Sequence, residues 1–383
     1  MIKLLNNERV RGIVYQALLL AIVIGVGWYL VSNTLHNLAA RQIQVGFGFI
    51  GREAGFEIAE KLVEYDASRS YGRAFVVGLL NTLWVATLGI IVATLLGTLI
   101  GIARLSSNWL IARLASAYVE VMRNIPLLLQ LFVWYGVFTE LLPPVREALS
   151  AGEWIFLSQR GLRYAWPAPA PGWTAAAWAL LPAIALAFGY RWLARRRQSQ
   201  TGAQWPVAAP VAAIIIGLPL LAWLAGGAPT ELDMPKLGGF DFQGGHTLSP
   251  EFLALVIGLA TYTAAFIAEV VRGGIMAVPH GQTEAALALG LRPGQRLRLI
   301  TMPQALRVII PPLTSQYLNL TKNSSLAVAI GYPDLVGVAN TVMNQTGQAI
   351  EAIAILMAVY LTISLTISVL MNWYNAHIRL VER

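Results

Sequence analysis

The feature that most constrains this chain is a series of apolar stretches, each close to the roughly 20 residues that a helix needs to cross a bilayer. Of the 383 residues, 57% are hydrophobic and 12% are charged, about half the charged share of a soluble domain. Such a chain is solvated largely by lipid, so we expect an all-α polytopic membrane protein with about eight spans. The expected spans are residues 13–33, 76–103, 117–139, 174–193, 207–225, 251–270, 308–331 and 350–372.

The distribution of Lys and Arg predicts the orientation of these spans. With the N-terminus inside, the inner segments contain sixteen Lys and Arg, whereas the outer segments contain nine. Because basic residues are in excess on the cytoplasmic side of membrane proteins, both termini are predicted to be cytoplasmic. The strongest local indication of this orientation is the cluster of Arg195, Arg196 and Arg197 between two apolar stretches. The bases are scattered and form no basic face, so membrane lipids are expected as surroundings and nucleic acid is not expected as a partner.

Several enzyme classes are excluded by what the chain lacks. It has no Cys, which excludes a thiolate metal site and a Cys nucleophile, and its four His are far apart in the sequence. The segment Gly46–Gly51 spells GxGxxG, but it lacks the strand and the helix that a dinucleotide site needs, so we expect a flexible extracytoplasmic loop. None of the four Lys follows a Gly, so the chain has no P-loop for ATP. We therefore expect no catalytic residue, no metal and no cofactor in this chain.

Composition also divides the chain. Residues 1–71 are expected to form an N-terminal membrane anchor, with a cleaved signal peptide as the alternative, followed by a solvated and partly helical extracytoplasmic loop. Residues 140–250 are rich in Pro, Gly, Ala and Trp, and their two spans carry few polar residues, which favours a lipid-facing insertion. By contrast, the spans within 76–139 and 251–372 contain Thr, Asn, Gln, Glu and Lys, so function is expected there.

The strongest motif lies between the sixth and seventh spans. Glu284–Gly290 is followed after nine residues by Ile300–Pro303. Gly290 suits a left-handed helix cap and Pro293 the first turn of a second helix, so the segment is predicted to form two short helices joined at a corner. The small residues around Gly290 permit close approach by another protein, which favours a docking element over a plain basic loop.

This segment resembles the EAA-x3-G-x9-I-x-L-P signature of binding-protein-dependent ABC importer permeases, with Met302 in place of the usual Leu. Other stretches resemble the polar amino-acid branch of that family (His, Glu, Gln, Arg and opines), and the extra spans resemble the larger permease subunit of general L-amino-acid importers. These stretches are Asn81–Leu83, Met122–Gln130, Ala268–Ile275 and Leu320–Leu326.

The resemblance implies a type I ABC importer permease core of five helices within 72–375, interrupted by 140–250, with an extra N-terminal helix and a two-helix insertion. It implies that residues 281–303 form a cytoplasmic coupling loop on which an ATPase docks. The residues expected to couple the chain to that ATPase are Glu284, Ala285, Ala286, Gly290, Arg292 and Pro303.

A polar stripe on the seventh span indicates a translocation path. Ser315, Asn319 and Lys322 recur at helical spacing, and a charged Lys within a span costs about 2.5–3.5 kcal/mol, so it should face a cavity or a partner. A hydrogen-bond network between helices explains the stripe equally well. Pro311-Pro312 is expected to kink or break this helix, and Pro126 is expected to kink the third span. The candidate path residues are Ser315, Gln316, Asn319, Lys322 and Asn323, together with Thr261 and Glu269 on the sixth span, although Glu269 is also expected to pair with Arg272.

The predicted function is that of a permease subunit of an ATP-driven amino-acid importer in the bacterial inner membrane. The resemblance implies a dimer of ATPase subunits that holds ATP and Mg, a second and non-identical permease, and an extracytoplasmic amino-acid-binding protein. The alternatives are an ion-gradient-driven secondary transporter or channel, which should show internal repeats and paired acidic residues at the bilayer midplane, and a scaffold that only assembles other subunits.

Overall fold

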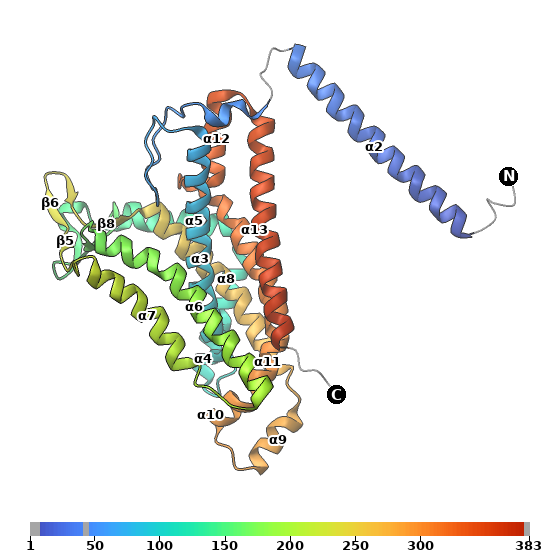
Figure 1. Ribbon diagram of the computed structural model, residues 1–383, viewed down its shortest axis with the longest axis vertical. Coiled ribbons are helices and arrows are strands. Elements are labelled where there is room, and N and C mark those ends of the chain that lie inside the picture. The colour runs from blue at the N-terminus through green and yellow to red at the C-terminus, as the bar shows by residue number, and fades with distance from the viewer. Residues whose placement is uncertain (1–7, 41–45, 379–383) are drawn as a thin grey trace. The chain divides into compact units, whose positions relative to one another are not determined.

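The computed structural model describes residues 8–40 and 46–378, and it is predominantly helical (Figure 1). Six helices are long and apolar enough to cross a membrane, and two bent helix pairs bring the possible total to eight, which confirms the expected membrane architecture. The six helices are α2 (Glu8–Ala40), α3 (Tyr71–Ala103), α6 (Pro171–Thr201), α7 (Ala208–Ala225), α8 (Pro250–Met276) and α13 (Ala349–Ile378).

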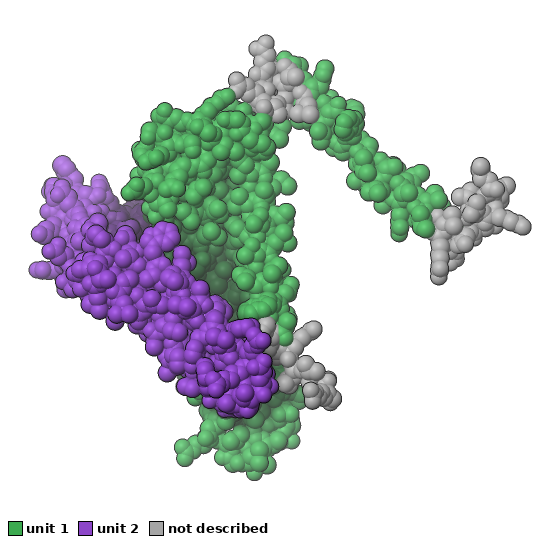
Figure 2. Space-filling model, in the orientation of Figure 1, with its two compact units in different colours: residues 1–135, 254–383 green, residues 136–253 purple. Residues whose placement is uncertain are grey.

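The chain divides into two compact units, residues 1–135 with 254–383 and residues 136–253 (Figure 2). The second unit contains the expected insertion 140–250. Both termini, and the topology-determining bases Lys3, Arg41, Arg379 and Arg383, lie outside the described residues.

The expected span 117–139 is not one straight helix. α4 (Trp109–Asn124) meets the helical segment Leu127–Leu141, made of α5 (Leu127–Gly136) and a π-helical turn, at an angle of 105°. The expected kink at Pro126, which cannot donate the helical hydrogen bond, lies at this corner. The buried Gln130 side chain stabilises the corner, because its Nε2 donates to the carbonyl oxygens of Met122 (2.9 Å) and Ile125 (3.0 Å).

The second bent pair corrects the expectation for Pro311-Pro312. α11 (Met302–Asn323) runs through both prolines without a break, and the chain continues as a 3₁₀-helix, Ser324–Ile330. The bend of 52° comes later, before α12 (Leu335–Thr346), where Gly331 adopts a left-handed conformation with φ of 80°.

Small residues let α3 pack closely against α8. A Cβ atom added at Gly97 would lie 2.6 Å from Ile267 Cβ and 2.8 Å from the Ala264 carbonyl oxygen, and Gly101 is equally close to Ala268 and Val271. The Gly97-x-x-x-Gly101 pattern is therefore a helix-packing notch, as its spacing indicates.

Replacing Gly97 with Ala is expected to lower the thermal midpoint of the purified protein, because forcing a methyl group into this contact costs about 1–3 kcal/mol. The gain in helix propensity, about 1 kcal/mol, offsets only part of that cost. Gly189→Ala in α6 is the matched control, since nothing lies within 4 Å of its added Cβ. Equal midpoints for the two variants would contradict the close packing.

The segment before α3 is partly helical and mostly exposed, as expected from the sequence, but it also contributes to the core. It contains a 3₁₀-helix, Phe47–Gly51, and buries Phe49, Ala54, Ile58 and Tyr65 in one apolar cluster with residues of α3, α12 and α13. Burial, with the negative charge of Glu57 nearby, raises the pKa of Tyr65 to about 12. The alternation of charged and apolar residues in this segment concealed its contribution to the core.

Two polar residues near the start of α3 tie this end of the bundle together. Asn81 Nδ2 donates to the carbonyl oxygens of Glu60 (2.8 Å) and Pro333 (2.9 Å), and Thr82 Oγ1 accepts from the Leu335 amide (3.0 Å). Both side chains are almost fully buried. The Asn81–Leu83 motif therefore fixes the turn that precedes α12.

The second unit combines a helical hairpin with short strands that the sequence reasoning did not predict. α6 and α7 pack against each other, and Gly172 and Gly226 touch where the hairpin's free ends meet. The strands are two to four residues long, too short for a period-2 pattern to be recognised among the prolines and glycines. They form an antiparallel sheet β1-β2-β3-β8 and the pairs β4-β5 and β6-β7. Their bounds are β1 Leu149–Ala151, β2 Ile155–Ser158, β3 Gly161–Tyr164, β4 Trp166–Pro167, β5 Leu232–Asp233, β6 Lys236–Gly238, β7 Asp241–Gln243 and β8 His246–Leu248.

Candidate functional site

The expected coupling loop folds as its local sequence dictates. α9 (His280–Ala288) is followed by Gly290, whose φ of 70° is left-handed, and α10 (Pro293–Arg296) begins on a proline. The Gly290 amide donates to the Leu287 carbonyl (2.9 Å) and the Leu291 amide to the Ala286 carbonyl (3.1 Å). These bonds satisfy the last carbonyl groups of α9 and set the corner between the two short helices.

Most of the expected docking residues are available to a partner. Glu284, Ala285, Gly290, Arg292 and Pro303 are all exposed. Ala286 is the exception.

The Ala286 side chain is only 2% exposed, because α9 packs back on the π-helical turn Leu297–Thr301. Its methyl group therefore stabilises the loop itself and is not part of the exposed surface, which corrects the sequence-based assignment of Ala286 as a docking residue.

The loop lies beside the turn between α3 and α4. A cavity of about 690 Å³ is lined by both segments and by the end of α8, including Ile102, Ser106, Met276, His280 and Pro293. The end of α3 remote from α12 therefore meets the coupling loop, so movement of the loop bears directly on α3, α4 and α8.

A three-way ion pair lies in this part of the bundle. Glu269 on α8 accepts hydrogen bonds from Arg104, at the end of α3, and from Arg272 Nη2 (2.6 Å), while Arg104 Nε donates to Ser116 Oγ on α4 (3.4 Å). The expected Glu269–Arg272 pair is thus confirmed. Both carboxylate oxygens of Glu269 are occupied by arginines, so this residue joins α8 to the end of α3, and Arg104 extends the link to α4. The expected place of Glu269 in an open translocation path is not supported. Arg104, 165 residues away in sequence, could not be foreseen.

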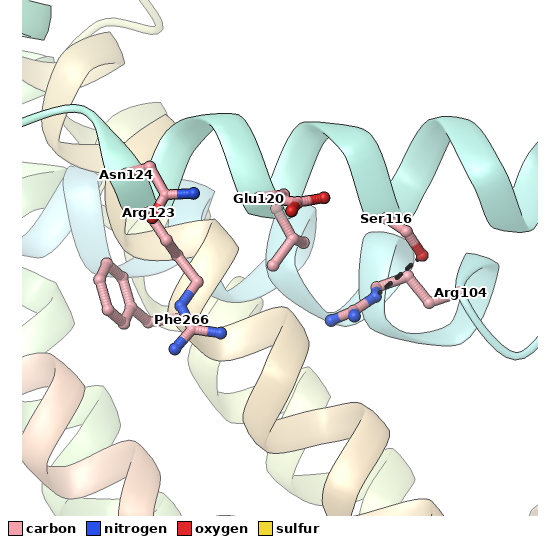
Figure 3. A pocket seen from close by; sticks show the side chains of 7 residues that line it. Arg104, Ser116, Glu120, Arg123, Asn124 and Phe266 are labelled. Carbon is pink, nitrogen blue, oxygen red and sulfur yellow. Dashed lines mark hydrogen bonds between the residues drawn. The ribbon is translucent and has the colours of Figure 1, made fainter.

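A polar cavity of about 410 Å³ runs from Arg104 along α4 (Figure 3). Glu120, Arg123 and Asn124 line it from α4, and Phe266 lines it from α8. Arg123 stacks over the Phe266 ring at 5.3 Å and forms no ion pair with Glu120 within the described part of the chain. This cavity could not be predicted from the sequence, because it depends on how α8 packs against α4.

The polar stripe of α11 lies on one face, as its spacing predicts. Ser315, Asn319 and Lys322 are exposed, whereas Leu313 and Leu320 on other faces are buried. Among the described residues, no carboxylate lies within ion-pair distance of the Lys322 ammonium group.

The other residues expected to line the translocation path are less exposed. Gln316 and Asn323 are half-buried on α11. Thr261 turns its hydroxyl onto its own helix, where Oγ1 donates to the Ile257 carbonyl (2.7 Å), and its carbonyl accepts from Tyr118 Oη (2.7 Å). The hydroxyl of Thr261 is therefore hydrogen-bonded within α8, and its carbonyl oxygen is hydrogen-bonded to α4.

Comparison with known proteins identifies the family. The family model described as binding-protein-dependent transport system inner membrane component matches residues 194–380. The putative amino-acid ABC transporter permease protein YhdX of Escherichia coli (strain K12) is 52% identical over 381 residues, covering 98% of this chain and 96% of that protein. The general L-amino acid transport system permease protein AapQ of Rhizobium johnstonii is 49% identical, covering 98% and 94%. The chain belongs to the binding-protein-dependent transport system inner membrane components.

A third relative and one solved structure extend this comparison. The glutamate/glutamine/aspartate/asparagine transport system permease protein BztB of Rhodobacter capsulatus is 43% identical, covering 99% of this chain and 96% of that protein. A chain from the crystal structure of an amino acid ABC transporter with histidines aligns over 80% of this chain and 95% of its own length, with a TM-score of 0.47 and 23% identity.

The protein is thus a multi-pass inner-membrane permease subunit of an ABC transporter, a family in which ATPase and binding-protein partners are implied and ATP hydrolysis lies in a separate subunit. The alternative of an ion-gradient-driven transporter or channel receives no support from these relatives.

Proposed function

We propose that this permease imports amino acids and that its energy comes from an ATPase docked on residues 281–303. The observation that carries the proposal is the exposed corner around Gly290, which adjoins the ends of α3 and α8 and the start of α4. The relatives YhdX, AapQ and BztB are all described as amino-acid permeases, which supports the substrate class. The docking surface comprises Glu284, Ala285, Gly290, Arg292 and Pro303.

ATP and Mg are proposed to bind in the partner subunit. No Lys of this chain follows a Gly, so a P-loop is absent from its full sequence. A dimer of ATPase subunits and an extracytoplasmic amino-acid-binding protein complete the importer in this proposal.

A second, non-identical permease is proposed to face the stripe on α11. An exposed Lys within a membrane protein is costly when it faces lipid, so Lys322 requires a water-filled path or a partner chain. Ser315 and Asn319, on the same exposed face, support a polar wall built between two permeases.

Both termini are proposed to be cytoplasmic. The excess of sixteen basic residues over nine supports this orientation. It places the coupling loop inside the cell and the segment 46–70 outside, at opposite ends of α3.

Import by the assembled complex tests the function. The permease, its ATPases, its partner permease and the binding protein are reconstituted into liposomes, and uptake of radiolabelled L-amino acids is measured with and without ATP. Uptake that requires ATP and the binding protein is expected. Uptake driven by a sodium or proton gradient without the ATPase would overturn the proposal.

Lys322→Gln is expected to reduce ATP-driven uptake at least tenfold, because the path loses its positive charge for a substrate carboxylate. Lys322→Arg keeps the charge and is expected to retain more uptake. Lys236→Gln, in an exposed strand of the second unit, is the control for loss of one positive charge. If Lys322→Gln imports as well as Lys236→Gln, Lys322 is not part of the path.

A further inference from the structure

The loop end of the α6–α7 hairpin carries an unusual concentration of positive charge. Four arginines lie within the seven residues 191–197 near the end of α6, and all four are exposed: Arg191, Arg195, Arg196 and Arg197. Residues 154–230 contain no Asp or Glu, so neither helix of the hairpin nor the connection between them supplies a counter-charge. Within the described residues, none of the four arginines forms an ion pair.

Aromatic rings contact two of these four arginines. The Arg197 guanidinium lies 4.5 Å from the centre of the Trp205 ring, and that of Arg196 lies 5.2 Å from the Trp192 ring. Trp205 in turn stacks on Tyr190. Such contacts order a guanidinium group while leaving its N–H groups free to bind an anion.

The connection between the helices is closed by a further bond, because the Tyr190 hydroxyl donates to the Pro206 carbonyl (2.9 Å). The cluster of Arg191, Arg195, Arg196 and Arg197, together with Trp192 and Trp205, is called the basic cluster below.

The position of the basic cluster matches the edge of the hydrocarbon layer. Arg191 lies 20 residues after Pro171, the first residue of α6, which is about 30 Å at the helical rise and equals the thickness of the hydrocarbon core. Between these points α6 exposes large apolar side chains, among them Trp178, Leu181 and Phe188. The hairpin therefore contacts acyl chains along its length, and the basic cluster lies where headgroup phosphates begin.

We propose that the basic cluster binds the headgroup of an anionic phospholipid of the cytoplasmic leaflet. Four uncompensated guanidinium groups at headgroup depth are complementary to phosphate, which arginine binds through two parallel hydrogen bonds. Basic residues placed immediately beyond a membrane helix attract anionic lipid at about 1 kcal/mol each. This gives the insertion a role that the transport cycle does not require: it anchors the permease in anionic lipid. The leaflet follows from the proposed orientation, and lipid binding is measured independently of transport.

The test compares lipid binding by the purified importer complex. Binding of phosphatidylglycerol and of phosphatidylcholine with the same acyl chains is titrated by native mass spectrometry. We expect the wild type to prefer phosphatidylglycerol. We expect Arg195→Gln/Arg197→Gln to bind it about 30-fold more weakly, the fold-change for two arginines at about 1 kcal/mol each. Arg146→Gln/Lys236→Gln also removes two positive charges from the second unit, outside the basic cluster, and should bind as the wild type does.

Two further measurements make the result decisive. Because the chain has no Cys, Ser199→Cys introduces a single labelling site into the wild type and into each variant. Its reaction with a membrane-impermeant maleimide shows on which side of the membrane the loop end of the hairpin lies. Inorganic phosphate is added as a competitor, and it should not displace the lipid. Equal binding of the two lipids by the wild type, unchanged binding in correctly oriented Arg195→Gln/Arg197→Gln, or displacement by inorganic phosphate would each overturn the proposal.

Discussion

Replacing Gly290 with Asp is expected to abolish ATP-driven uptake while leaving the permease in the membrane. Gly290 has a φ of 70°, which strains most other residues but which Asp tolerates better than most, and its exposed position leaves nothing within 4 Å of an added Cβ. The new carboxylate, however, stands at the corner where we propose that the ATPase docks. A charge buried there without a partner costs several kcal/mol, enough to prevent docking. Copurification with the ATPase and uptake in liposomes measure the effect.

Two variants separate docking from backbone strain. Gly290→Asn tolerates the left-handed conformation about as well as Asp does but adds no charge, so partial docking is expected. Gly202→Asp places the same side chain at another exposed, left-handed position with open space around it, and docking should be unaffected. If Gly290→Asp copurifies with the ATPase and transports normally, residues 281–303 do not couple the chain to it.

The second large effect is expected at Glu269, where one carboxylate serves two arginines. Glu269→Gln leaves Arg104 and Arg272 close together without a negative charge. Breaking such a partly buried pair by removing one partner costs about 3 kcal/mol, so we expect a clear fall in thermal midpoint and loss of uptake. The effect on uptake follows because the ion pair joins α3, α4 and α8 beside the coupling loop.

The double variant Glu269→Gln/Arg104→Gln tests the electrostatic reason. Removing a positive charge together with the carboxylate should restore part of the thermal midpoint, because an unpaired charge costs more than a missing pair. A double variant less stable than Glu269→Gln would show that Arg104 contributes through packing, and that the ion pair is not what holds the three helices.

The features predicted correctly from the sequence are those determined by neighbouring residues. The corner at Gly290 follows from a glycine that tolerates positive φ and a proline at the start of the next helix. The Glu269–Arg272 pair follows from helical spacing. The stripe of Ser315, Asn319 and Lys322 on one face follows from the same periodicity.

The features that the sequence did not disclose depend on residues far apart in the chain. Arg104 reaches Glu269 only because the glycines of α3 bring it against α8. The burial of Phe49 depends on α12 and α13, which come much later in the sequence. Ala286 was expected to face a partner because its neighbours do, yet the π-helical turn after α10 covers it. Pro126 indicated a kink in the third span, but the sequence could not give its size, and the apolar length of residues 117–139 suggested one crossing helix where the structure turns by 105°.

The hydrogen bonds of Asn81 and Thr82 have a consequence for the synthesis and insertion of the chain. Glu60, one partner of Asn81, is synthesised before it, but Pro333 follows 252 residues later. At 5–20 residues per second the ribosome needs roughly 13 to 50 seconds to reach it. During that time α3 sits in the bilayer with polar groups awaiting partners. Residues 136–253 occupy nearly half of this interval, so the insertion lengthens the period in which Asn81 and Thr82 lack their later partners.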